Sequence, residues 1–205
     1  MNPLPNVAPS WNVAPTQGAL VVRRHPETGE RRLDLLTWGL VPHWTKDLEA
    51  ARKPINARAE TVATSDMFRA ALAERRCLVP AGAFYEWKAM PGGKQPYAIA
   101  RQDGAPLAFA GLWDGWRGLD GTVLRTFAII TTPANAIMAT LHDRMPAILE
   151  PEDWPAWLGE VEGDPVALLR PAADTVLRLW PISRAVNNVR NNGASLLDPI
   201  PVLDR

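Results

Sequence analysis

Short apolar runs separated by turn residues recur along this chain, and the pattern favours strands over long helices. Apolar positions over residues 20–23 and 31–38 flank a turn at His25–Gly29, which predicts a β-hairpin. Further runs with strand character cover residues 77–80, 84–88, 97–101, 107–113, 123–131 and 176–180. Asp-Gly pairs at Asp103, Asp114 and Asp120 predict turns between them. The dominant element is therefore an antiparallel sheet.

Helices are predicted to be few and short. Residues 65–76 carry apolar positions at helical spacing after a capping residue, Ser65 or Asp66. Further helices are predicted over residues 133–141, 151–158 and 165–169, the last two with proline in the first turn. The first 18 residues hold four prolines and are expected to form an extended, docked lead-in. With no repeat or linker, residues 1–205 are expected to form a single α+β domain around an antiparallel, barrel-like sheet.

Composition narrows the class of protein. The 205 residues are 47% hydrophobic, enough for one sizeable core, and 20 prolines with 14 glycines disfavour a helical bundle. Lys and Arg number 22, as do Asp and Glu, so no global field attracts nucleic acid. Nine tryptophans stand out, and several flank polar motifs where a ring can act as a stacking platform.

The cysteines and histidines indicate whether the protein binds a metal, and the apolar runs indicate whether it enters a membrane. One cysteine excludes an internal disulfide, and three scattered histidines lack ligand spacing, so we expect neither a metal nor a cofactor. No apolar run approaches about 18 residues, and the N-terminus lacks the pattern of a signal peptide. We therefore expect a soluble cytoplasmic protein.

The stretch from Pro54 to Thr61 concentrates polar chemistry. In a strand, Asn56 and Arg58 would point to the same side and present an amide beside a guanidinium, a pair suited to a phosphate or carbonyl oxygen. The alternative is structural: Asn56 satisfies a turn, and Arg58 forms an ion pair with Glu60 or Glu74.

Two more residues are candidates for proton transfer. Glu86 lies in Phe84-Tyr-Glu-Trp87, where aromatic neighbours favour the protonated carboxyl group and so suit general acid/base work. His142 offers an imidazole next to Asp143 and Arg144. A solvent-facing carboxylate and a structural histidine are the alternatives, and His25 and His43 are expected to be structural.

Cys77 and His142 also occur in the order of a papain-like pair. Cys77 lies in the apolar run Cys77-Leu-Val-Pro80, where a thiol is typically an inert part of the core. A thiol peptidase therefore remains the weakest of the functional hypotheses.

Six ordered blocks resemble one known family, the SOS response-associated peptidase (SRAP) family. The blocks cover nearly the whole chain. They are Trp11-Asn-Val-Ala-Pro-Thr-Gln17, Trp38-Gly-Leu-Val-Pro42, Asn56-Ala-Arg-Ala-Glu-Thr61, Phe84-Tyr-Glu-Trp87, His142-Asp-Arg-Met-Pro146 and Val186-Asn-Asn-Val-Arg-Asn191. The resemblance implies a compact mixed sheet wrapped by short helices, and a role in shielding abasic sites in single-stranded DNA by a covalent DNA-protein cross-link, with self-processing peptidase activity.

The resemblance also implies roles for individual residues. Asn56 would hold the reacting N-terminus and sugar, Glu86 would be the acid/base near the amine, and His142 would protonate the sugar oxygen. The implied DNA contacts are phosphate binding by Arg58 and Arg144, base support by Trp38 and Trp44, and strand contacts by Pro15 and Thr131. Asp66 lies where family members can carry a basic residue. The expected partner is single-stranded DNA bound by a monomer.

The chain departs from the family at its start. Family members begin Met-Cys-Gly-Arg, and the exposed cysteine forms a thiazolidine with the abasic aldehyde, whereas this sequence begins Met1-Asn2-Pro3. Cys77 has no free amine, so it cannot replace that nucleophile. We therefore expect this chain to be inactive in cross-linking, either as a truncated copy of an enzyme or as a non-catalytic module for single-stranded DNA or strand junctions. Asn56, Glu86 and His142 together favour the first explanation.

Overall fold

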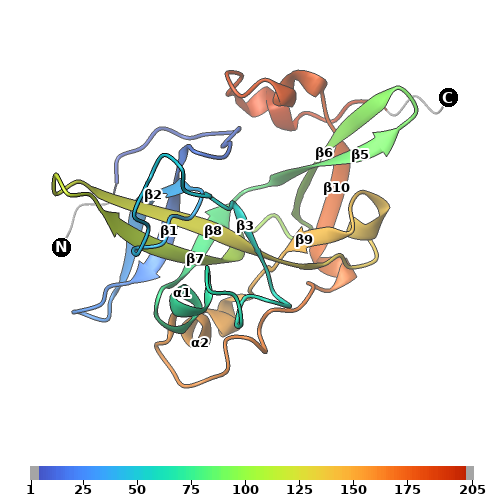
Figure 1. Cartoon of the computed structure of the whole chain (residues 1–205). Helices are drawn as coiled ribbons and strands as arrows, with labels where there is room; N and C mark the ends of the chain where they lie inside the picture. The colour runs from blue at the N-terminus through green and yellow to red at the C-terminus, as the bar shows by residue number, and fades with distance from the viewer. Residues whose placement is uncertain (1–4, 202–205) are drawn as a thin grey trace.

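A five-stranded barrel forms the centre of the structure. The computed structural model describes residues 5–201 (Figure 1). The strands are β1 (Gly18–Arg24), β2 (Arg31–Trp38), β3 (Asn56–Arg58), β4 (Arg76–Ala81), β5 (Phe84–Met90), β6 (Gly93–Arg101), β7 (Leu107–Arg117), β8 (Val123–Pro133), β9 (Arg144–Pro146) and β10 (Leu177–Pro181). The barrel has the cyclic order β2-β1-β4-β7-β8, and a parallel β2–β8 pairing closes it. The predicted α+β class and barrel-like sheet are confirmed.

Two short strands extend the barrel at β8. β3 pairs with β8 in parallel, with Asn56 opposite Ile129 and Arg58 opposite Thr131, and β9 pairs antiparallel with β8. A separate antiparallel sheet of order β10-β6-β5 stands at one end of the barrel, at the upper right of Figure 1.

Apolar residues alternate between the two faces of the central strands, and each face packs into a separate core cluster. On β7, Leu107 and Phe109 join an interior cluster with Val21 and Leu36, whereas Ala108 and Leu112 pack on the outer face with the helices. This period of two is the one expected for a strand buried on both sides. It explains why the first six residues of β7 are all buried.

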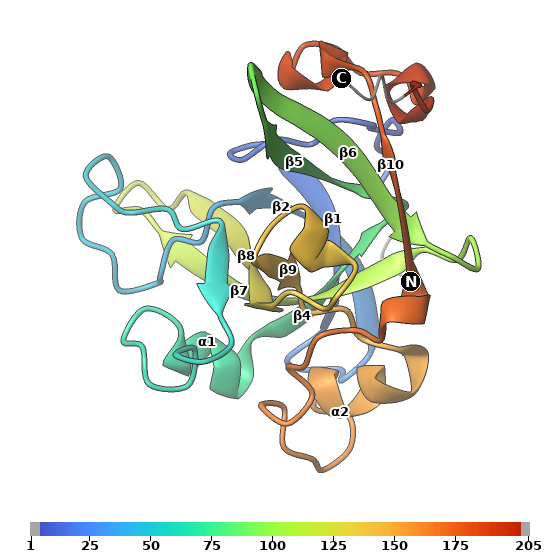
Figure 2. The same cartoon turned by 90° about the vertical axis from the view of Figure 1, so that its right-hand side faces the viewer.

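Two short α-helices cover the outer face on the same side of the barrel (Figure 2). They are α1 (Arg69–Glu74) and α2 (Trp154–Leu158). Trp157 of α2 is fully buried and donates its indole N–H to the Cys77 carbonyl oxygen at 2.8 Å. One-turn 3₁₀ helices cover Met138–Thr140, Pro151–Asp153, Asp174–Val176, Arg184–Asn187 and Ala194–Leu197.

Several boundary predictions were wrong. The helix expected over residues 65–76 is only six residues long, and Phe68 precedes it without a side-chain cap. The helix over residues 133–141 is reduced to Met138–Thr140, and in place of the helix over residues 165–169 there is a turn at 165–168. β8 continues through Pro133, and the Asn135 Oδ1 accepts a hydrogen bond from the Met138 N–H as a capping residue does, so the helical turn begins only after Asn135.

The turn predicted at Asp114 is absent. Asp114 lies inside β7. Its carboxylate accepts hydrogen bonds from the backbone N–H groups of His43 and Gly115. β4 and β5 belong to different sheets and do not pair across residues 81–83.

The structure excludes Cys77 as a nucleophile. Its side chain is fully buried in β4, and burial raises the pKa of its thiol far above the ordinary range. A Cβ at Gly111 on the neighbouring strand would lie 2.9 Å from the Cys77 Sγ, so the thiol is packed against backbone. It is part of the core.

Candidate functional site

One groove of about 720 Å³ gathers most of the residues proposed from the sequence. Seven of the nine line it: Pro15, Trp38, Asn56, Glu86, Thr131, His142 and Arg144. Its apolar floor belongs to the interior core cluster, through Val79, Phe109, Phe127 and Ile129. The groove therefore has a rigid apolar base and a polar rim assembled from segments far apart in the sequence.

β3 presents Asn56 and Arg58 as the alternation predicts. Both side chains are exposed while Ala57 between them is buried. Asn56 lines the groove and Arg58 does not. Pairing of β3 with the central strand β8 fixes the direction of both side chains.

Glu86 lies on β5 and is half-buried among aromatic residues. Its Oε1 accepts a hydrogen bond from the Trp87 backbone N–H at 3.0 Å. The Trp87 indole N–H in turn donates to Asn187 at 2.8 Å. The carboxylate is thus held by its own strand, and Asn187 holds the ring of the next residue, Trp87.

His142 lies just before β9, with 45% of its side chain exposed. Its Nδ1 is 3.0 Å from the Arg144 backbone nitrogen, and a backbone N–H can only donate. Nδ1 is therefore the acceptor, and we assign the proton of the neutral ring to Nε2. An imidazole with that proton can donate it to an oxygen in the groove.

Arg144 is held by the protein itself. Its Nη1 and Nη2 donate to the two carboxylate oxygens of Glu60 at 2.5 and 3.0 Å. Nη2 also donates to the Thr131 carbonyl at 2.6 Å. These bonds hold the pKa of Glu60 below its usual range. The ion pair that the sequence suggested between Arg58 and Glu60 is formed by Arg144 instead.

The two tryptophans proposed for base contacts are placed differently. Trp38 donates its indole N–H to the Ile55 carbonyl at 2.9 Å and stacks on Phe127, with ring centroids 6.3 Å apart. It forms a rigid wall of the groove. Trp44 is 54% exposed and lies outside it, over a smaller hollow of about 210 Å³ that also includes Lys46 and Arg52.

Sequence reasoning missed the clamp between the two ends of the described chain. The Asn12 amide donates to the carbonyls of Val186, Asn188 and Asn191, and it is only 8% exposed. The Tyr85 hydroxyl donates to the Trp11 carbonyl at 2.6 Å. The amide-rich run Asn187–Asn192 was the available signal, because such residues often bond to backbone groups.

Comparison with known proteins decides the family. The chain matches the family described as SOS response associated peptidase (SRAP) over residues 2–189. The chain belongs to the SRAP family. The resemblance of the six blocks is thereby confirmed, while the roles of individual residues remain predictions.

Named relatives are similar to this chain over most of their length. The chain is 40% identical over 194 residues to the abasic site processing protein YoqW of Bacillus subtilis, covering 93% of this chain and 86% of that protein. It is 34% identical over 197 residues to the abasic site processing protein YedK of Escherichia coli, covering 93% of this chain and 84% of YedK. A crystal structure from Bacteroides thetaiotaomicron aligns with a TM-score of 0.80 at 26% identity, over 91% of this chain and 82% of that one.

The described part of this SRAP protein adds two observations. Between residues 5 and 201, no helix is long and apolar enough to cross a membrane. Within the same residues, no group of three or more His, Cys, Asp or Glu side chains is placed to hold a metal ion.

Proposed function

We propose that this protein binds single-stranded DNA at abasic sites, and that its groove serves to shield them through covalent attachment of the sugar to an N-terminal cysteine of the family type, which the sequence beginning Met1-Asn2-Pro3 does not supply. The observation that carries this proposal is the meeting of Asn56, Glu86 and His142 in one groove. They come from β3, β5 and the turn before β9, so the fold and not the local sequence unites them. Relatives named abasic site processing proteins support the same substrate.

The three polar groups divide the chemistry. The Asn56 amide can both donate and accept, so it orients the N-terminus and the opened sugar. Glu86 accepts a proton from the attacking amine and returns it when water leaves. His142 donates its Nε2 proton to the ring oxygen of the sugar as the bond between that oxygen and C1 breaks. The C1 hydroxyl gives up its proton through water, which restores the proton on Nε2, and the aldehyde is formed. An amine and a thiol on the same residue then close a thiazolidine, whereas an amine alone stops at a reversible imine.

DNA binding combines charge with stacking. Arg58 is exposed beside the groove and binds a phosphate of the flanking strand. Trp38 supports the nucleotide at the abasic position, and Trp44 stacks on a base further along the strand. Pro15 and Thr131 line the path between these contacts.

The test is a denaturing gel with single-stranded DNA that carries one abasic site. Two versions of the protein are compared: the chain as printed and one extended with an N-terminal Met-Cys-Gly-Arg segment of the family type. Residues 1–4 lie outside the described residues, so the gel, and not the structure, tests the nucleophile. A heat-stable adduct with the extended protein would support thiazolidine chemistry in this groove.

Controls separate chemistry from binding. DNA with an intact base in place of the abasic site should give no adduct, and binding of both DNAs is measured by fluorescence anisotropy. Tight binding with no adduct from either version would reject the cross-linking role and leave a non-catalytic single-stranded DNA or junction-binding module.

A further inference from the structure

Glu60 is an acidic residue that bonds to a side chain lining the groove, Arg144, and the proposed reaction gives it no role. It lies two residues after the end of β3, in the turn that closes the run beginning with Asn56. Its side chain is 46% exposed, yet both carboxylate oxygens accept hydrogen bonds from Arg144. A paired, planar Arg-carboxylate contact of this kind fixes orientation as well as position.

Arg144 is anchored on two sides. Besides Glu60, its Nη2 contacts the carbonyl and the hydroxyl of Thr131 on β8, at 2.6 and 3.2 Å. Only 19% of the Arg144 side chain is exposed. The guanidinium therefore ties the first residue of β9 to the turn after β3 and to β8. This anchor adds to the β8–β9 pairing, in which Arg144 lies opposite Pro133, in fixing the Arg144 backbone.

That backbone sets the state of His142. The Arg144 N–H donates to His142 Nδ1 at 3.0 Å, which keeps the ring proton on Nε2. The Asp143 Oδ1 lies 3.2 Å from the same Nδ1. A carboxylate only accepts, so Asp143 favours a proton on Nδ1. Two neighbours thus favour opposite tautomers, and the placement of the Arg144 N–H decides between them.

We propose that Glu60 is a positioning residue for His142, acting through Arg144 to keep the imidazole proton on Nε2. This inference rests on the proposed function, in which His142 donates that proton to the sugar. Loss of the Glu60 carboxylate lets the start of β9 shift, so the Arg144 N–H no longer donates to His142 Nδ1. Nδ1 then carries the ring proton and donates it in a hydrogen bond to Asp143. The ring then presents an unprotonated Nε2 to the groove.

The tautomer can be read directly by NMR on the free, full chain. Long-range ¹H–¹⁵N spectra at mildly alkaline pH, where imidazoles are neutral, separate protonated from unprotonated ring nitrogens. The chain has three histidines, which makes assignment by single substitution practical. The parent protein should show His142 protonated on Nε2.

Three variants test the inference. Glu60→Ala should move the His142 Nδ1 signal toward that of a protonated nitrogen, and Glu60→Gln, which keeps the volume and one acceptor, should move it less. Adding Asp143→Asn to Glu60→Ala should reverse the shift, because the competing carboxylate is gone. Glu49→Gln removes an exposed carboxylate of the same size elsewhere and should leave the signal unchanged.

The result that would overturn the proposal is an unchanged His142 spectrum in folded Glu60→Ala or Glu60→Gln. A shift that persists when Asp143→Asn is added would also overturn it. Because the spectra use no DNA and no nucleophile, they are independent of the adduct assay. A failed adduct assay beside the expected spectra would reject the reaction and keep the positioning contact.

Discussion

Asn12 and Val186 lie 174 residues apart in the sequence, yet the Asn12 amide nitrogen donates a hydrogen bond of 3.1 Å to the Val186 carbonyl. The same amide also contacts the carbonyls of Asn188 and Asn191. Both sides of this contact line the groove. The lead-in and the tail therefore hold each other in place and together form one groove wall.

Replacing this amide should weaken the fold. Asn12→Ala removes the partner of the carbonyl of buried Val186 and is expected to lower the free energy of unfolding by about 1–3 kcal/mol. Urea unfolding of the variant and the parent measures the difference. Asn6→Ala, at an exposed position, is the matched control and should change stability by no more than about 0.5 kcal/mol. Equal effects of the two substitutions would contradict the clamp.

Arg58 should account for one phosphate contact. Arg58→Ala is expected to weaken binding of single-stranded DNA and to reduce the slope of log K against log salt by about 0.7, the contribution of one neutralised phosphate. Anisotropy titrations at several salt concentrations give the slope. Arg117→Ala removes an exposed arginine that does not line the groove, and this control should leave the salt slope unchanged. An unaltered slope in Arg58→Ala would remove the phosphate assignment.

Trp44 should contribute to binding without contributing much to stability. The ring is 54% exposed, so Trp44→Ala removes little buried surface. Loss of one stacked base is expected to weaken single-stranded DNA binding by about 1–3 kcal/mol. Anisotropy and thermal unfolding together separate the two effects, and an equal loss in both would make Trp44 a structural residue.

Glu86 should affect reaction more than binding. Glu86→Gln keeps the shape and the hydrogen bond to the Trp87 N–H but cannot take up a proton. The rate of adduct formation with abasic DNA should fall, while the dissociation constant for the same DNA stays close to that of the parent. Matching losses in rate and affinity would argue against an acid/base role.

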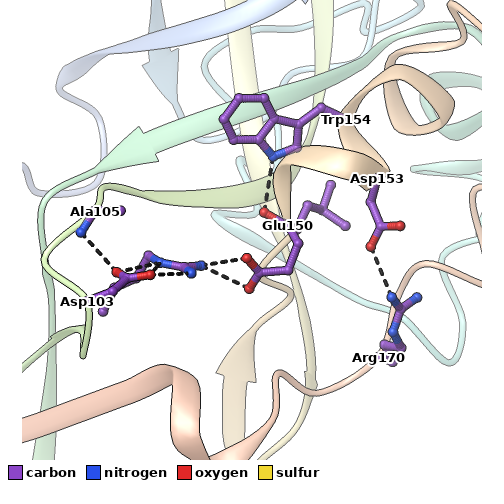
Figure 3. Close-up of polar contacts among 8 residues, drawn as sticks. Asp103, Ala105, Glu150, Asp153, Trp154 and Arg170 are labelled. Atoms are coloured by element: carbon purple, nitrogen blue, oxygen red, sulfur yellow. Dashed lines mark hydrogen bonds and ion pairs between the residues drawn. The ribbon is translucent and has the colours of Figure 1, made fainter.

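A second network away from the groove predicts acid sensitivity. Arg101 donates to both Asp103 and Glu150, and Figure 3 shows these two carboxylates on opposite sides of one guanidinium. Hydrogen bonds from Arg101 lower the pKa of Asp103 from 3.8 to about 2. Because the folded pKa lies below the unfolded one, the stabilisation is complete above pH 3.8 and is lost as the pH falls toward 2.

Urea unfolding between those pH values measures this effect. The parent should lose stability across the window, and Asp103→Asn should lose less. Arg101→Gln removes the cation and should flatten the same part of the curve. A parent-like slope in both variants would exclude the Arg101 network as its source.

Much of the sheet was predictable because strands impose a period of two on apolar residues. The β1–β2 hairpin and β7 and β8 lie where the alternation places them, and Asn56 and Arg58 share a face as expected. Helices were harder to predict. The region from 133 to 141 has helical apolar spacing, but β8 continues through Pro133 and the Ala134 N–H donates to the Asp143 carbonyl, so the tertiary structure leaves room for only one helical turn.

The sequence by itself determined the family, the strand-rich class and the residue types available for chemistry, because ordered motifs and alternation are local properties. Only the tertiary structure decided which of those residues meet. It placed seven of them around one groove and left Trp44 and Arg58 outside it. It also paired Arg144 with Glu60 in an ion pair. These outcomes depend on barrel closure and on pairing across more than 80 positions, such as the 84 between Glu60 and Arg144, and no local pattern encodes such distances.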